Sequence, residues 1–214
     1  MDRAIFLDRD GVLNPNVFNP LTGCWESPHR PADFRLKHGV VEALKRLQDA
    51  GYSLFVVSNQ PSYAKGKTSL ENILSIAGKL REELSEAGIY VARYYYCFHH
   101  PDGVVPGFSG PCVCRKPSPY FLKEAEREFA LDLRTSWMVG DRASDIACGR
   151  QANVQTILVR PDHPDKSSVE IHAYAVVDDL AGAADVILGS IPVKVVVDRK
   201  PGNDSKPLEA ASVL

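Results

Sequence analysis

The chain has 214 residues, of which 44% are hydrophobic and 24% are charged, and its formal net charge is -2. These values are typical of a globular protein with one well-buried core. Because the sequence has no long run of like charge or of apolar residues, it does not indicate a surface for nucleic acid, a membrane span or a secretory leader. We therefore expect a single domain over residues 1–190, located in the cytoplasm.

Strands and helices are expected to alternate along the chain. Hydrophobic patterns predict strands near residues 3–7, 53–57, 91–96, 135–139, 154–159 and 174–177, and helices near 38–50, 70–87, 118–130 and 143–151. This order is typical of an α/β fold, a mainly parallel sheet with helices on both faces, whose ligands bind outside the carboxyl ends of the strands. Residues 191–214 are expected to form an edge strand at 193–197 followed by a flexible tail.

Two carboxylates follow the first predicted strand. Asp8 and Asp10 are two residues apart, and Gly11 comes directly after them. Residues i and i+2 of an extended chain project the same way, so both carboxylates can converge on one small ligand. A divalent cation together with a phosphate suits this geometry. An ordinary turn that closes a strand is the alternative, because aspartate and glycine also favour turns.

Two further polar groups follow later strands. Ser58, Asn59 and Gln60 stand at the end of the strand at 53–57, where a hydroxyl and two amides can hold a phosphate oxygen. Arg115 and Lys116 precede the helix at 118–130. Cations beside the N-terminus of a helix suit an anion.

A third group, Asp141 and Asp145, follows the strand at 135–139 with a spacing of one helical turn. In chain order, Asp-x-Asp-Gly, Ser-Asn, Lys-Pro and Gly-Asp-x-x-x-Asp resemble the four motifs of the haloacid dehalogenase (HAD) superfamily of phosphohydrolases. The resemblance implies a Rossmann-like HAD fold with a minimal cap, and an enzyme that hydrolyses phosphate esters. A module that binds a phosphate ligand without hydrolysing it is the alternative.

Four potential metal ligands form two close pairs: Cys97 with His99, and Cys112 with Cys114. Structural zinc sites take four Cys or His ligands, and in a cytosolic protein metal binding outranks disulfides. We therefore predict a zinc loop at 97–114. Ordinary buried thiols are the alternative, and His100 is a competing ligand. Cys24 and Cys148 are expected to be unligated.

The Cys-x-His and Cys-x-Cys-Arg-Lys-Pro pattern is similar to the zinc loop of a HAD subgroup that contains heptose-bisphosphate and histidinol-phosphate phosphatases. The subgroup implies a structural zinc that shapes the pocket. The Ala64-Lys65-Gly66 segment favours the heptose enzymes, which implies removal of the 7-phosphate of D-glycero-D-manno-heptose 1,7-bisphosphate. Histidinol phosphate or another small phosphate ester is the alternative. Pro61 and Tyr63 depart from the heptose pattern and predict an altered sugar-facing pocket.

The resemblance also implies catalytic roles. Asp8 would be the nucleophile that forms an aspartyl-phosphate, and Asp10 would be the general acid and base. Mg²⁺ would be held by Asp8, the backbone carbonyl of Asp10, and Asp141, with Asp145 as indirect support. Lys116 would stabilise charge on the transferring phosphoryl group together with Ser58.

Substrate binding is expected from a wider set of polar residues: Arg9, Asn16, Asn19, Ser58, Asn59, Gln60, Arg115, Lys116 and Arg142. The three arginines of this set are candidates for a second phosphate. Trp25, His29 and Arg30 belong to a long segment, 16–36, that either touches substrate or forms a solvated loop. The expected partner is a small phosphorylated metabolite, and the protein is expected to be a monomer.

A third class of function is protein docking at the zinc loop. The only feature that suggests a docking function is the aromatic run Tyr94, Tyr95 and Tyr96. A buried strand beside the zinc loop explains the same residues.

Overall fold

The computed structural model describes residues 2–162 and 172–189. Its central sheet has six parallel strands in the order β5-β4-β1-β6-β7-β8. These strands are β1 (Arg3–Leu7), β4 (Tyr52–Asn59), β5 (Val91–Cys97), β6 (Trp137–Gly140), β7 (Gln155–Val159) and β8 (Ala175–Val177). The predicted parallel sheet is therefore confirmed. The predicted edge strand at 193–197 and the C-terminal tail lie outside the described residues.

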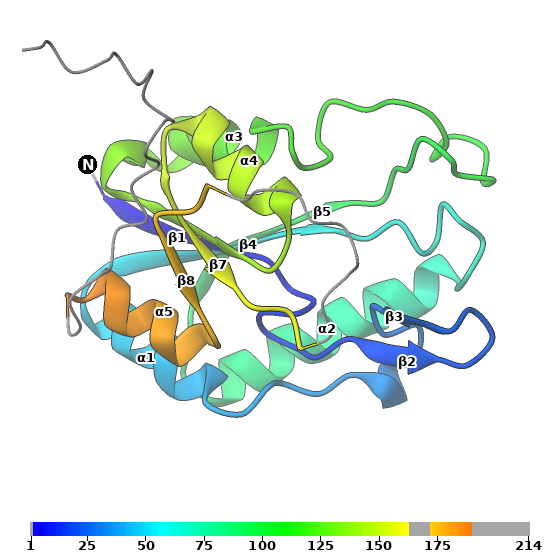
Figure 1. Ribbon diagram of the computed structural model, residues 1–214, viewed down its shortest axis with the longest axis horizontal. Helices are drawn as coiled ribbons and strands as arrows, with labels where there is room; N and C mark the ends of the chain where they lie inside the picture. Colours follow the sequence, from blue (N-terminus) through cyan, green and yellow to red (C-terminus); the bar gives the residue numbers. More distant parts are fainter. Residues whose placement is uncertain (1, 163–171, 190–214) are drawn as a thin grey trace, which may run out of the picture.

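Helices cover both faces of the sheet (Figure 1). The helices on one face are α1 (Val40–Asp49), α2 (Leu70–Glu86) and α5 (Leu180–Ile187), and those on the other are α3 (Tyr120–Phe129) and α4 (Ala143–Ala152). The central strand β1 shows how the two layers arise. Ile5 and Leu7 belong to the core on the first face, whereas Ala4 and Phe6 belong to the core on the second. Alternate side chains of a strand point to opposite faces, so a continuous apolar run serves both layers.

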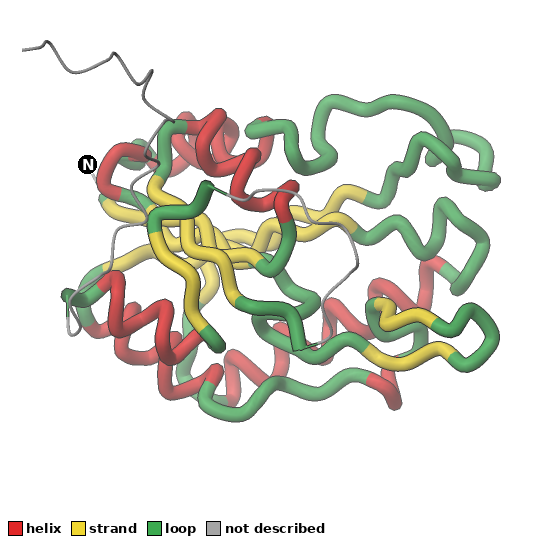
Figure 2. Tube along the Cα trace, in the orientation of Figure 1, coloured by secondary structure: helices red, strands yellow, loops and turns green. Residues whose placement is uncertain are grey.

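The sequence patterns do not predict two of the elements. Helix α5 has eight residues and is mostly buried, so it lacks the polar face that would reveal a helical period. The other element is an antiparallel hairpin of β2 (Val17–Asn19) and β3 (Cys24–Glu26), whose strands have three residues each. Short 3-10 turns occur at Pro31–Asp33 and Leu133–Thr135. The hairpin and the loops after β4 and β5 extend beyond one end of the sheet (Figure 2).

The aromatic run on β5 is half-buried. Tyr94 and Tyr96 pack against the first core, and Tyr95 packs against the second. The run is thus part of the sheet, and because its side chains pack against the two cores it gives little support to a docking surface. Within residues 2–162 and 172–189, no helix is both long and apolar enough to cross a membrane.

Candidate active site

Three neighbouring strands bring the predicted catalytic residues to one edge of the sheet. Strands β4, β1 and β6 are adjacent, and their carboxyl ends lead to Asn59, Asp8 and Asp141. The backbone N–H of Asp8 donates to the carbonyl of Val139 at 2.9 Å, which fixes the first carboxylate beside β6. The predicted convergence at this edge is therefore observed.

The carboxylate of Asp8 faces a buried ammonium group. Lys116 Nζ lies 3.0 Å from Asp8 Oδ1 and 2.6 Å from Asp145 Oδ1, and it donates to the carbonyl of Val57 at 2.7 Å. Burial alone would lower the pKa of Lys116, but the charges of Asp145 and Asp8 outweigh burial and raise the pKa. Lys116 is therefore a fixed cation beside the place where a phosphoryl group would react.

Asn59 holds the backbone of Lys116. Its Nδ2 donates to the Lys116 carbonyl at 3.1 Å, and its Oδ1 accepts from the Lys116 N–H at 3.0 Å. The amide that was expected to bind phosphate thus fixes the backbone of the cation that faces Asp8.

Three carboxylates come together at this edge. One oxygen each from Asp8, Asp141 and Asp145 can be chosen so that all three lie within 4.8 Å of one another. Asp141 Oδ1 is buried and has no hydrogen-bond partner. Burial, together with the charges of Asp8 and Asp145, raises the pKa of Asp141 to about 8. A buried oxygen that has no hydrogen-bond partner and lies among like charges fits a hard divalent cation such as Mg²⁺, which prefers oxygen ligands.

Asp145 makes two further contacts. Its Oδ2 accepts the backbone N–H of Arg142 at 3.0 Å and so caps helix α4, while its Oδ1 pairs with Lys116. Both contacts suit the indirect supporting role that was expected for this carboxylate.

Three side chains donate to Asp10. Arg9 Nη2 lies 2.9 Å from Oδ1, Asn14 Nδ2 lies 2.9 Å from the same oxygen, and Gln60 Nε2 lies 2.6 Å from Oδ2. Burial would raise the pKa of Asp10, but Arg9 and the two amides outweigh burial and hold the pKa below its ordinary value. Before substrate binds, Asp10 is therefore a carboxylate.

Some predicted substrate-binding residues lie outside the cavity lining and contact Asp10 or one another instead. Arg9 is fully buried and bonds to Asp10 and Gln60, so its position does not support the expected contact with a second phosphate. Ser58 is also buried, and its Oγ accepts from Gln60 Nε2 at 3.0 Å. The structure therefore places Arg9, Ser58 and Gln60 around Asp10.

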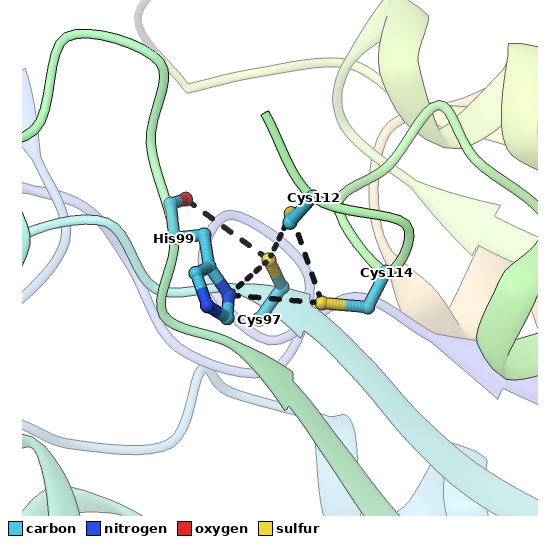
Figure 3. Close-up of side chains that lie close together, drawn as sticks. All are labelled: Cys97, His99, Cys112 and Cys114. Carbon is cyan, nitrogen blue, oxygen red and sulfur yellow. Dashed lines mark hydrogen bonds between the residues drawn. The ribbon is translucent and has the colours of Figure 1, made fainter. Parts of the chain in front are cut away.

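The four predicted zinc ligands come together (Figure 3). Cys97 Sγ lies 3.6 Å from Cys112 Sγ and 4.0 Å from His99 Nδ1, and Cys114 Sγ lies 3.8 Å from Cys112 Sγ and 3.9 Å from His99 Nδ1. Zinc–sulfur bonds of about 2.3 Å at tetrahedral angles separate two sulfurs by about 3.8 Å, whereas a disulfide bond is about 2.05 Å long. The spacing thus fits a tetrahedral metal site. His100, the competing ligand, instead accepts the Asp102 N–H on its Nδ1.

The cluster of Cys97, His99, Cys112 and Cys114 is connected to the candidate active site. Arg115 Nη1 donates to the carbonyl of His99 at 3.3 Å. The ring of Tyr63 packs edge-on against Phe108 with centroids 5.0 Å apart, and Phe108 lies 5.6 Å from the ring of His99. Tyr63 therefore joins the loop after β4 to the zinc loop, and of the two residues that depart from the heptose pattern only Pro61 lines the cavity beside Asp8 and Asp10.

A cavity of about 220 Å³ opens beside the carboxylates of Asp8, Asp10 and Asp145. Its lining combines the catalytic residues with the hairpin, the loop after β4 and the zinc loop: Asp8, Asp10, Trp25, Glu26, Ser27, Asn59, Pro61, Ser62, Lys65, Lys67, Arg115, Lys116, Arg142, Ser144 and Asp145. The predicted residues Arg115, Lys116 and Arg142 thus meet in one cavity with Asp8 and Asp10.

Other predicted contacts lie outside this lining. Asn19 Nδ2 donates to Glu26 at 3.3 Å within the hairpin, and Asn16 is half-buried with an unpartnered Oδ1. Arg30 pairs with Asp33 at the surface. Cys24 is exposed, and Cys148 is a buried residue of α4.

The cavity also contains residues that the sequence patterns do not identify. Glu26, Ser27, Ser62, Lys65 and Lys67 line it from the hairpin and from the loop after β4. Only Lys65 belongs to a segment, Ala64-Lys65-Gly66, that resembles the pattern of the heptose enzymes. The others show no motif, because their partners lie in segments far apart in the chain.

Known proteins resemble this chain in sequence and in fold. A family model described as HAD-hydrolase-like matches residues 113–183. The chain is 36% identical over 179 residues to D-glycero-beta-D-manno-heptose-1,7-bisphosphate 7-phosphatase from Yersinia pestis, which covers 83% of this chain and 91% of that protein. It is 35% identical over 169 residues to D-glycero-alpha-D-manno-heptose-1,7-bisphosphate 7-phosphatase from Photorhabdus laumondii, which covers 78% of this chain and 88% of that protein.

A solved structure, D,D-heptose 1,7-bisphosphate phosphatase from B. bronchiseptica complexed with magnesium and phosphate, matches with a TM-score of 0.71 and 27% identity. The match covers 88% of this chain and 99% of that one.

Proposed function

The chain is a phosphatase of the HAD family, and we propose that it removes the 7-phosphate of D-glycero-D-manno-heptose 1,7-bisphosphate. The observation that carries this proposal is the pairing of a nucleophile, Asp8, with a buried cation, Lys116, in a cavity that also holds further positive charge. The identity of the sugar in this proposal comes from the names of the related proteins. The prediction of HAD resemblance from the four motifs is confirmed by these relatives.

The positive charge of the cavity favours a bisphosphate. Lys67 is paired with Glu26, and Lys116 is paired with Asp8 and Asp145. Among the described residues, Lys65 and Arg115 have no ion-pair partner, and Arg142 Nε is 3.9 Å from Asp141 Oδ1. These three cations can bind a second phosphate, because guanidinium and ammonium groups both donate to phosphate oxygens.

The first chemical step uses Asp8. Its Oδ1 accepts the Arg9 N–H at 2.7 Å and pairs with Lys116, which leaves Oδ2 to attack phosphorus. A bond forms between this oxygen and phosphorus while the bond from phosphorus to the sugar oxygen breaks. Lys116 stabilises the negative charge of the equatorial phosphoryl oxygens.

Asp10 moves the protons. It gives a proton to the departing sugar oxygen and then takes one from the water that hydrolyses the aspartyl-phosphate. Arg9, Asn14 and Gln60 hold Asp10 as a carboxylate in the free protein, so it takes up its first proton only when the negative charge of the bound phosphate is added.

Two metals are part of the proposal. Asp8, Asp141 and the backbone of Asp10 would hold Mg²⁺, which when bound neutralises charge on the carboxylates and the phosphate. Cys97, His99, Cys112 and Cys114 would hold a structural Zn²⁺. The cytoplasmic location and the monomeric state stay predictions.

A side-by-side assay tests the substrate. Purified, magnesium-supplied protein is given heptose 1,7-bisphosphate or histidinol phosphate, and kcat/KM is measured for each. We expect a preference for the bisphosphate of at least about a hundredfold, or roughly 2.7 kcal/mol of transition-state discrimination. A preference for histidinol phosphate would reverse the assignment. Turnover of neither ester, together with tight binding of one, would support a binding module instead.

A matched variant tests the second phosphate subsite. Lys65→Gln removes one cavity cation without touching the catalytic carboxylates. It should lower kcat/KM for the 1,7-bisphosphate but leave kcat/KM for heptose 7-phosphate within about twofold, because the second substrate lacks the charge that Lys65 would meet. Equal losses on both esters would argue against a second subsite at Lys65.

A further inference from the structure

The β2–β3 hairpin forms part of the cavity that holds Asp8 and Asp10. Trp25, Glu26 and Ser27 come from its second strand and the residue after it, and all three line the cavity. The hairpin extends beyond the carboxyl end of the sheet together with the loop after β4 (Figure 2). The phosphoryl-transfer steps use none of these three side chains.

Trp25 is the aromatic residue of the cavity lining. It is 42% exposed. Phe18 is its partner across the hairpin, and the two rings lie 5.5 Å apart at an interplanar angle of 57°. An aromatic side chain supported in this way offers a large contact area at a low cost in side-chain entropy.

Glu26 fastens the hairpin to the loop after β4. Its Oε1 accepts from Lys67 Nζ at 2.6 Å and from Thr22 Oγ1 at 2.9 Å, and its Oε2 accepts from Asn19 Nδ2 at 3.3 Å. Thr22 and Asn19 belong to the hairpin, whereas Lys67 belongs to the loop. The Glu26 side chain is only 13% exposed, so solvent screens this ion pair less than a surface pair.

A second connection lies next to the first. His29 Nε2 is 3.1 Å from Ser62 Oγ, and the Ser62 hydroxyl is also 3.2 Å from Ser27 Oγ. Thr68 Oγ1 donates to the carbonyl of His29 at 2.6 Å. Contacts of Glu26, Ser27 and His29 therefore join the hairpin segment to the loop after β4, and Glu26 and Ser27 are the residues that follow Trp25 in the chain.

We propose that Trp25 is a specificity-determining residue that packs against the carbon skeleton of the sugar carrying the scissile phosphate, and that Glu26 is a positioning residue that holds Trp25 there. This inference rests on the proposed function. The C–H groups of a sugar carry a small positive charge, and they meet the negative face of an indole ring favourably. Asp8 and Lys116 bind the phosphate of any ester, whereas Trp25 contacts only a leaving group long enough to reach the hairpin.

Two substrates separate these contributions. Heptose 1,7-bisphosphate reaches the hairpin, whereas the two-carbon leaving group of acetyl phosphate is too short to do so. Trp25→Ala should raise KM for the heptose ester at least tenfold and leave kcat/KM for acetyl phosphate within twofold. Trp25→Phe should recover most of the affinity, because it restores an aromatic face. Leu21→Ala is the matched control, because Leu21 is an apolar hairpin residue that is 94% exposed and lies outside the cavity lining.

A double-mutant cycle tests the positioning role of Glu26. Glu26→Gln alone should raise KM for the heptose ester in the same direction as Trp25→Ala. Adding Glu26→Gln to Trp25→Ala should raise KM by less than twofold more, because residues that act through one contact are not additive. Full additivity would overturn the claim that Glu26 acts through Trp25.

The outcomes distinguish this inference from the proposed function. A wild-type protein that hydrolyses acetyl phosphate but not the heptose ester would overturn both. With a wild-type protein active on the heptose ester, the inference alone would be overturned if Trp25→Ala kept the wild-type KM for that ester, or if Trp25→Phe, with its acetyl phosphate activity intact, lost as much affinity as Trp25→Ala. The acetyl phosphate activity of each variant also shows that its catalytic carboxylates are intact, so a misfolded variant is recognised.

Discussion

Asn59 and Lys116 are joined by two hydrogen bonds between the side-chain amide of one and the backbone of the other. Asn59 Nδ2 donates to the Lys116 carbonyl at 3.1 Å, and the Lys116 N–H donates to Asn59 Oδ1 at 3.0 Å. The two residues are far apart in the chain: Asn59 ends β4, and Lys116 follows the zinc loop. This pair fixes the start of the Lys116 side chain, whose Nζ then reaches Asp8 and Asp145.

Asn59→Ala should therefore weaken catalysis through Lys116. We expect kcat to fall about 10- to 100-fold, the usual effect of removing a residue that orients a catalytic group. The loss of two hydrogen bonds should also cost about 1–2 kcal/mol of unfolding free energy. Asn72→Ala is the control, since Asn72 bonds to Thr68 away from the cavity lining. An Asn59→Ala variant with normal kcat would show that Lys116 does not depend on this pair.

Gly11→Ala should inactivate the protein by displacing Asp141. Gly11 has a φ of 86°, and a Cβ added there would lie 2.1 Å from Asp141 Oδ2. The backbone strain alone should cost about 1–3 kcal/mol, and the clash should also move a proposed metal ligand. Gly51→Ala is a matched control, because Gly51 has a φ of 84° and no heavy atom within 4 Å of an added Cβ. Denaturant unfolding and phosphatase activity should show that both variants are destabilised but that only Gly11→Ala is inactive.

Removal of zinc should loosen the loop that carries Arg115 and Lys116. Burial raises the pKa of the Cys97 and Cys114 thiols, so their thiolates need a cation beside them. We expect one zinc per chain by elemental analysis. Cys112→Ser should lose this zinc and lower Tm by more than about 2–4 °C, the shift that 1 kcal/mol produces in a chain of this size. Cys24→Ser should keep both, because Cys24 is exposed and lies outside the cluster. Full zinc content in Cys112→Ser would contradict the four-ligand site.

His29 should make stability depend on pH. Burial lowers the pKa of His29, and Lys67 adds to this effect, while Glu26, Asp10 and Asp33 oppose it. Because the folded state holds its proton less tightly than the unfolded state, stability is full above the unfolded pKa of about 6.5 and is lost as pH falls through the folded pKa. His29→Gln should therefore show a smaller loss of unfolding free energy than the wild type when pH falls below about 6.5. Identical slopes in both proteins, measured by urea unfolding across this window, would contradict the shift.

Local patterns in the sequence were sufficient to predict the parallel sheet and the edge of the sheet at which Asp8 and Asp141 meet. Asp8 and Asp141 come together because each follows an apolar strand, and parallel strands end at the same edge. Arg9 was assigned to a phosphate because guanidinium groups bind phosphates, yet it bonds to Gln60, which is 51 residues away. Glu26 was not identified for the same reason, since its partner Lys67 is 41 residues away. Contacts of this kind depend on the folded arrangement of loops, which neither periodicity nor motif spacing reveals.

Phosphorus-31 NMR of the reaction tests most directly which phosphate the cavity places against Asp8. Wild-type protein acting on heptose 1,7-bisphosphate should convert the signal of the 7-phosphate into inorganic phosphate and leave the anomeric phosphate in place. Asp8→Asn should keep its fold and zinc but slow this conversion by at least about 10⁴-fold, the scale of losing a nucleophile. Loss of the anomeric phosphate first, or conversion at the wild-type rate by Asp8→Asn, would contradict a 7-phosphatase that acts through Asp8.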